Sequence, residues 1–198
     1  MSRIINISGL TPIEDPSYRY KMPTVVGKIE GRGNGIKTVI VNISELALSL
    51  HRDAGEVNKF FGCEMGAQTT FNEEDDRAVV NGAHSDMEMQ QCVHKYIEKF
   101  VLCPNCGLPE TTYSIKQGCI WHRCAACGAK EMVDMNHKLT TYILSQDKKN
   151  KKEKAKAKAE KAKEDKENGS EEDKKKKKKK DKGSDDEKVS SFRHIHLE

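Results

Sequence analysis

The chain has 198 residues, with 35 Lys and Arg, 31 Asp and Glu, and a formal net charge of +4. This length provides one modest core or two small ones, which excludes a large catalytic barrel. Residues 147–198 contain 20 basic and 14 acidic residues, and subtraction from the totals leaves 15 basic and 17 acidic residues in 1–146. The positive charge therefore belongs to the C-terminal segment, and the rest is not a basic nucleic-acid-binding surface by composition.

Residues 1–21 contain few apolar residues and several turn formers, which predicts a flexible N-terminal arm that becomes ordered on binding. Val-, Ile- and Thr-rich runs follow at 24–30 and 37–43, and the segment 31–35 between them is rich in Gly and Asn. Gly and Asn accept positive φ at low cost, so these runs predict the two strands of a hairpin.

Two short helices are expected next, one capped by Ser44 and one that starts at Asp53 with Glu56 in its first turn. The runs 67–71 and 77–81 then predict a second strand pair, joined across an acidic segment. These signals place helices between two β-rich regions.

The clearest predicted helix begins at Ser85, because Ser-Asp-Met-Glu fits a capping box. Its apolar positions recur at helical spacing and form one stripe that is expected to pack against a sheet: Met89, Cys92, Val93, Tyr96, Ile97 and Phe100. Residues 22–100 therefore predict a small α/β domain with a mixed sheet and helices, within an α+β fold class.

Cysteine spacing gives the strongest chemical signal. Two Cys-x-x-Cys pairs stand 17 residues apart, with a glycine directly after each: Cys103 and Cys106, then Cys124 and Cys127. Four thiolates at this spacing are typical of a structural zinc site with no open position, so residues 101–146 predict a zinc ribbon. Redox Cys-x-x-Cys chemistry is the alternative.

The other cysteines, Cys63, Cys92 and Cys119, have no paired spacing and are interpreted as small buried hydrophobic residues. His122 and His137 flank the ribbon as substitute metal ligands, but four thiols make them unnecessary.

The chain begins without the charged and then apolar pattern of a secretion signal, and no apolar run approaches the length of about 20 residues that crosses a membrane. We expect a cytoplasmic protein without membrane contact.

Residues 147–198 lose apolar periodicity and predict a disordered Lys-rich tail, either a solubilising linker or a nonspecific, salt-sensitive RNA contact.

No constellation of Ser, His and Asp indicates an enzyme. The segment 31–38 resembles a phosphate-binding loop only in composition, since Ile36 separates Gly35 from Lys37. Arg19, between two tyrosines, either reaches into another protein's site or stacks on its own domain.

Five segments resemble the family of eukaryotic translation initiation factor 5 and, more distantly, of the β subunit of initiation factor 2. They are Tyr-Arg-Tyr-Lys-Met-Pro at 18–23, Gly-Asn-Gly-Ile-Lys-Thr-Val-Ile-Val-Asn at 33–42, Phe-Gly-Cys-Glu-Met-Gly-Ala-Gln-Thr at 61–69, Val-Asn-Gly-Ala-His at 80–84 and Lys-Phe-Val-Leu-Cys-Pro-Asn-Cys at 99–106. The first two segments favour the factor 5 branch.

The resemblance implies an α/β domain followed by a zinc ribbon, and a GTPase-activating role in start-codon selection. Arg19 would be the arginine supplied in trans, with Lys37 and Lys59 at the family's other basic positions. Implied partners are the γ and β subunits of initiation factor 2 with GTP and initiator tRNA, the small ribosomal subunit and other initiation factors.

Two alternatives remain beside this interpretation: a non-catalytic assembly subunit that resembles the β subunit and binds partner protein and RNA, and an unrelated nucleic-acid-binding ribbon protein. The acidic balance of residues 1–146 argues against the second. Residues 51–58 lack the family's usual proline-rich sequence, which bears on the placement of Lys59. The family also continues into a C-terminal helical-repeat domain, so either the chain is a fragment or that role lies elsewhere.

Overall fold

The computed structural model describes residues 2–152. Residues 1–147 form one compact unit, and a second begins at residue 148. Of the predicted tail, residues 148–152 are helical and 153–198 lie outside the described residues, so the disorder predicted there stays a prediction. In chain order the elements are β1 (Ile4–Asn6), β2 (Lys21–Pro23), β3 (Gly27–Glu30), η1 (Gly33–Gly35), β4 (Lys37–Ile40), α1 (Ile43–Ser49), α2 (Ala54–Met65), β5 (Thr69–Asn72), β6 (Arg77–Asn81), α3 (Asp86–Tyr96), η2 (Ile97–Val101), β7 (Thr111–Lys116), β8 (Cys119–Cys124) and β9 (Lys130–Met132).

The largest sheet has four strands in the order β3-β4-β6-β5. The predicted α+β class is confirmed, and both predicted hairpins are present. The strand directions differ from the expected mixed sheet, because all three pairings in this sheet are antiparallel. Short loops return the chain directly within each hairpin, whereas a parallel neighbour needs a long crossover.

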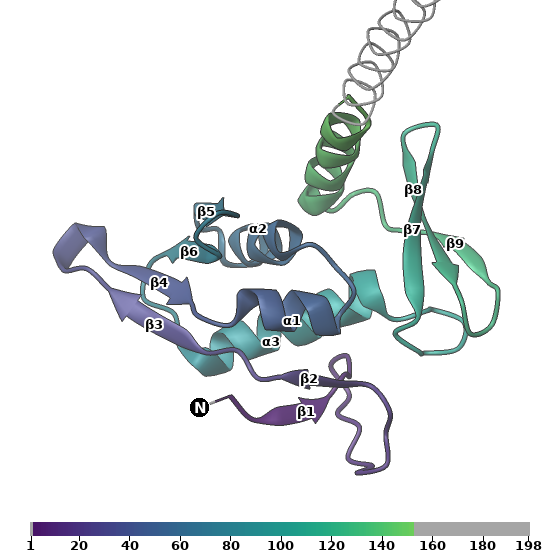
Figure 1. Cartoon of the computed structure of the whole chain (residues 1–198), viewed down its shortest axis with the longest axis horizontal. Coiled ribbons are helices and arrows are strands. Elements are labelled where there is room, and N and C mark those ends of the chain that lie inside the picture. The colour runs from purple at the N-terminus through teal and green to yellow at the C-terminus, as the bar shows by residue number, and fades with distance from the viewer. Residues whose placement is uncertain (1, 153–198) are drawn as a thin grey trace, which may run out of the picture. The chain divides into compact units, whose positions relative to one another are not determined.

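Helices α1, α2 and α3, together with η2, provide about half of the core residues beside this sheet (Figure 1). The stripe predicted for α3 is confirmed, since all of its members are buried: Met89, Cys92, Val93, Tyr96, Ile97 and Phe100. The same stripe continues through η2, where the helix widens to a π-turn, so Phe100 and Val101 stay on the buried side. The helix thereby leads from the four-stranded sheet to the first cysteine pair.

Two of the three predicted helix starts are correct. Ser85 caps α3 with a complete capping box, and the side chain of Asp53 accepts a hydrogen bond from the Gly55 N–H at the start of α2. Ser44 is not a cap, because α1 already begins at Ile43, after Asn42, and Ser44 lies within its first turn. Asn42 instead bonds the neighbouring strand connection, with Oδ1 accepting from the Val26 N–H at 3.0 Å.

The N-terminal residues are more ordered than the predicted arm. β1 pairs antiparallel with β2, and the Ile7 side chain is only 2 % exposed within the core. The Ile7 N–H also donates to the Tyr20 carbonyl oxygen at 2.9 Å. Ile4 and Ile5 supply strand propensity, and Ile7 and the partly buried Ile5 supply buried area, which together outweigh the turn formers that follow them.

A second sheet, with strands in the order β7-β8-β9, forms the ribbon, and residues 138–147 add a closing helix to the same unit. Leu139 and Ile143 of this helix are buried. Within residues 2–152, every helix is too short or too polar to span a bilayer.

Candidate metal centre and exposed arginine

The two cysteine pairs form matching turns at the base of the ribbon. In each turn the glycine N–H donates to the first cysteine's carbonyl oxygen, at 2.8 Å from Gly107 to Cys103 and at 3.1 Å from Gly128 to Cys124. Both glycines have positive φ, 70° and 73°, which other residues adopt at a cost. The glycines noted in the sequence therefore close the turns that aim four thiols inward.

The four thiols lie close enough to share one ion. Their sulfur atoms are all within 4.8 Å of one another, and the Cys103–Cys127 and Cys106–Cys124 pairs are each 3.6 Å apart. Tetrahedral zinc with sulfur at about 2.3 Å requires sulfur separations of about 3.8 Å. These residues therefore fit zinc, and they can hold it with no position left for a substrate.

The chemistry of the donors also favours a cation. Hydrogen bonds from the Ala129 N–H and from Asn105 lower the pKa of the Cys127 thiol to about 6. A hydrogen bond from the Leu108 N–H also acts to lower the pKa of the Cys106 thiol. Burial and hydrogen bonds with the other three thiols outweigh it and raise this pKa to about 12. Four thiolates this close repel one another, so a bound divalent ion is the natural counter-charge.

Neither histidine near the ribbon belongs to the metal cluster; among residues 2–152 that cluster consists of the four cysteines. His122 stacks on Tyr113 with ring centroids 5.6 Å apart. His137 stacks on Phe60 and contacts Glu64 at 3.3 Å. The interpretation that the histidines are not needed as ligands agrees with this geometry.

A polar cluster, which we call the ribbon joint, connects the ribbon with the α/β region. It consists of the buried residues Glu56, Tyr96 and His122 and the partly buried residues Arg52 and Tyr113. Arg52 donates to the carbonyl oxygens of Thr111 at 2.8 Å and Phe100 at 2.9 Å, and its guanidinium lies 4.3 Å from the Tyr113 ring centroid. These contacts tie the loop before α2 to the first ribbon strand.

Glu56 is the acceptor at the centre of the ribbon joint. Its carboxylate, in a residue only 5 % exposed, accepts from the Tyr96 hydroxyl at 2.6 Å and the Tyr113 hydroxyl at 2.8 Å. Burial raises the pKa of Glu56, against the hydroxyl donors and Arg52. Sequence reasoning missed this role, although a glutamate beside Val57 on the apolar side of α2 was a usable signal.

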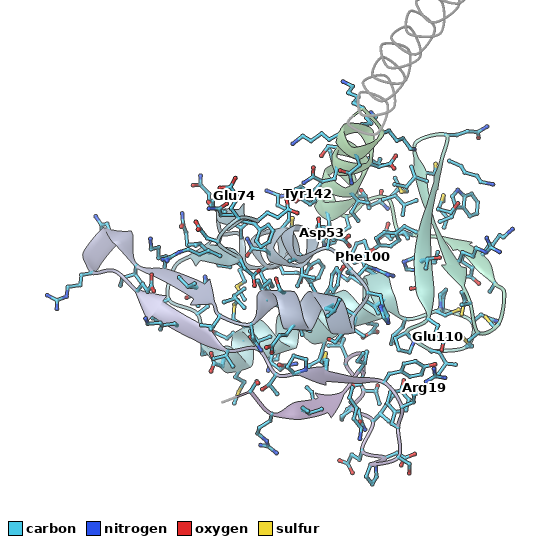
Figure 2. The ribbon with its side chains drawn as sticks, in the orientation of Figure 1. Arg19, Asp53, Glu74, Phe100, Glu110 and Tyr142 are labelled. Carbon is cyan, nitrogen blue, oxygen red and sulfur yellow. The ribbon has the colours of Figure 1, made fainter. Side chains whose placement is uncertain are left out.

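Arg19 is exposed in the loop between β1 and β2 (Figure 2). Its guanidinium lies 5.7 Å from the Tyr20 ring centroid, and Tyr18 meets Tyr20 edge-to-face at 5.5 Å. The Tyr20 hydroxyl donates to Glu110 at the start of the ribbon, and Figure 2 labels both Glu110 and Arg19 in this region. The tyrosines thus hold the loop on the domain while the charge of Arg19 faces solvent.

The other two basic residues singled out in the sequence are not brought to Arg19. Lys37 begins β4 at the loop end of the β3–β4 hairpin, across from Asn81. Lys59 is exposed on α2. Figure 1 shows that hairpin end far from the β1–β2 loop. The three cations therefore present separate points of contact.

Residues 11–130 match the family model described as the domain found in initiation factors 2B and 5. Eukaryotic translation initiation factor 5 of Mus musculus is 47% identical over 140 residues, which cover 70% of this chain and 33% of that protein. The Saccharomyces cerevisiae factor is 45% identical over 131 residues (66% and 32%), and the probable factor 5-1 of Arabidopsis thaliana is 47% identical over 137 residues (69% and 31%). The chain spans about a third of the length of these relatives.

Proposed function

This chain belongs to the family of the domain found in initiation factors 2B and 5, and we propose that it is a translation initiation factor that activates GTP hydrolysis by initiation factor 2. The names of its relatives support a translation initiation factor. The observation that carries the finer role is the exposed Arg19, held by two tyrosines on a loop. The chain itself would not be an enzyme, because the reacting nucleotide belongs to its partner.

Arg19 suits this role physically. A guanidinium stays charged at every physiological pH, and its planar fork contacts two phosphate oxygens at once. Such an arginine, inserted in trans, stabilises the charge that develops on the transferred phosphoryl group and raises the rate about a thousandfold or more. Because Tyr20 is tied to Glu110, the loop needs little reordering to present this side chain.

Lys37 and Lys59 would contribute differently. Both are at separate places on the surface, so we assign them to the nucleotide region or to ribosomal RNA rather than to the phosphate that Arg19 meets. The partners would be the γ and β subunits of initiation factor 2, GTP, initiator tRNA, the small ribosomal subunit and other initiation factors, in the cytoplasm. Zinc would have a structural role at the four cysteines.

The test is single-turnover GTP hydrolysis by initiation factor 2 on small ribosomal subunits. We expect Arg19→Ala to reduce the stimulated rate about a thousandfold, and Arg19→Lys to restore only a small part of it. Arg3→Ala is the matched control, since Arg3 is also exposed beside the β1–β2 sheet and uses its backbone N–H to bond Thr24. It should keep the full rate.

Binding of each variant to initiation factor 2 is measured in parallel. Full stimulation by Arg19→Ala would remove the arginine from the mechanism. If the unsubstituted chain binds but does not stimulate hydrolysis, the activator role fails and the non-catalytic assembly role, with the β subunit as its model, takes its place.

A further inference from the structure

The outer face of the ribbon sheet carries an aromatic and basic surface that neither the metal nor Arg19 explains. Its residues, which we call the tryptophan face, are Ser114 and Lys116 from β7, Trp121 and Arg123 from β8, and Lys130 from β9, and together they line a shallow pocket of about 290 Å³. The opposite face, with Tyr113, Ile120 and His122, is turned to the ribbon joint and the core.

Strand register places the cations on both sides of the indole. Trp121 lies directly opposite the small Ser114, which leaves the hollow beside the ring. Arg123 pairs with Lys130 on one side, and Lys116 pairs with Cys119 on the other. Cys119 and Arg123 are four residues apart on β8, which corresponds to about 13 Å along the strand. Lys116 therefore lies about this far from the pair of Arg123 and Lys130.

Among the described residues, no acidic side chain pairs with the charges of this face. Within residues 2–152 no salt bridge involves Lys116, Arg123 or Lys130, whereas Lys95 on α3 and Lys99 in η2 share Glu64. The acidic member of β9, Glu131, lies opposite His122 and so belongs to the other face by strand alternation. The Trp121 residue is 37 % exposed, although large aromatic residues are usually covered.

We propose that the tryptophan face binds single-stranded RNA, with one base stacked on Trp121 and the flanking phosphates held by Lys116, Arg123 and Lys130. An aromatic platform between cations is what a single strand needs, because every base has a π-face and each nucleotide carries a phosphate. A duplex would not fit this geometry, since its bases are already stacked on one another. The inference does not depend on GTPase activation by Arg19.

Trp121 is the only tryptophan of the chain, so its fluorescence reports on this face alone. We would titrate the zinc-loaded full chain with short oligo-U and oligo-A RNA and follow both tryptophan quenching and RNA anisotropy. Strong quenching that saturates together with the anisotropy is expected. Trp121→Ala should weaken binding about tenfold, which corresponds to the loss of one stacked base.

The cations are tested by salt dependence. Changing Lys116, Arg123 and Lys130 together to Gln should lower the slope of log affinity against log salt by about 2, at about 0.7 per phosphate. The matched control changes Arg3, Lys28 and Arg32 to Gln, three exposed cations outside the ribbon, and should leave tryptophan quenching intact. Zinc content is checked in every variant, and the Lys-rich segment is present in all of them.

Two results would overturn the proposal. If RNA binds the unsubstituted chain without changing its tryptophan emission, and binds Trp121→Ala with the same affinity, the RNA site lies elsewhere on the chain. Quenching by poly-glutamate peptides but not by RNA would instead identify the face as a docking site for an acidic protein segment.

Discussion

Glu56 shows how a single buried carboxyl links two parts of this molecule. Two tyrosine hydroxyls, from Tyr96 on α3 and Tyr113 on β7, donate to the same oxygen of Glu56. Arg52 stacks on Tyr113 and binds the carbonyl oxygens of Phe100 and Thr111, so a cation and an anion are both drawn into the joint. Removing one member would leave the others without partners, which is costly inside a protein.

We predict a pH-dependent gain in stability for Glu56→Gln. Burial raises the pKa of Glu56 in the folded chain above its unfolded value of about 4.3, so ionisation opposes folding. The stabilising contribution of protonated Glu56 is therefore present below about pH 4.3 and is lost as the pH rises through the folded pKa. The free energy of unfolding of Glu56→Gln, relative to the unsubstituted chain, should rise between about pH 4 and 7 in urea titrations of zinc-saturated protein.

Glu64→Gln provides a control of opposite sign. Partial burial acts to raise the pKa of Glu64, but hydrogen bonds from His137 and Lys99 more than offset it and the pKa is lowered. Its contribution is present above the unfolded pKa and lost on acidification, so Glu64→Gln should lose relative stability as the pH rises. Parallel pH profiles for both variants and the unsubstituted chain would contradict the assignment.

At the scale of elements, the two cysteine turns are the smallest structures on which the ribbon depends. Each turn combines a Cys-x-x-Cys pair, a left-handed glycine and a backbone bond across the turn. The strands β7, β8 and β9 hold these turns in position, since Cys124 ends β8 and pairs directly with Thr111 at the start of β7. Metal geometry therefore depends on backbone conformation at Gly107 and Gly128 as well as on the thiols.

Gly107→Ala should weaken zinc binding about tenfold. A Cβ at this position would meet no atom within 4 Å, so the cost comes from the φ of +70° alone. That conformation costs an alanine about 1–2 kcal/mol, which corresponds to about one order of magnitude in affinity. Competition with a chromophoric chelator measures the change. Gly35→Ala is the matched control, because its Cβ also meets open space and its φ is not left-handed; equal affinity in all three proteins would refute the prediction.

For the whole unit of residues 1–147, the ribbon and the α/β region share one hydrophobic cluster. Ile120 and Val133 of the ribbon region belong to the same cluster as Phe60, Phe100 and Leu139. The ribbon joint lies against this cluster and adds directional bonds to it. Loss of the metal should therefore be felt beyond the cysteine turns.

We predict that chelation of zinc reduces amide-exchange protection in α2 and in η2, as well as in β7 and β8. Without an ordered Tyr113, Glu56 and Arg52 lose bonds that hold α2 against the ribbon. The β3–β4 hairpin, at the opposite end in Figure 1, should keep its protection. Hydrogen exchange followed by mass spectrometry, with and without chelator, measures this. A loss confined to residues 103–132 would show that the two regions are energetically independent.

Local patterns were sufficient for much of this protein. The capping box at Ser85, the stripe from Met89 to Phe100 and the Gly-rich hairpin at 31–35 all rest on interactions within a few residues of the chain, and all are present in the structure. The four thiols also come together as predicted, because Cys-x-x-Cys turns form locally and only two such turns had to meet. Short-range geometry made these features predictable.

Tertiary structure decided the rest. Strand directions, the pairing of β1 with β2 and the burial of Ile7 depend on partners far along the chain, which no local pattern specifies. The ribbon joint combines residues from 52 to 122, and the tryptophan face exists only because the register aligns alternate residues of three strands. The sequence by itself determined the two hairpins, the helices α2 and α3 and the two cysteine turns. Their mutual packing determined which side chains are buried as partners and which remain open to bind.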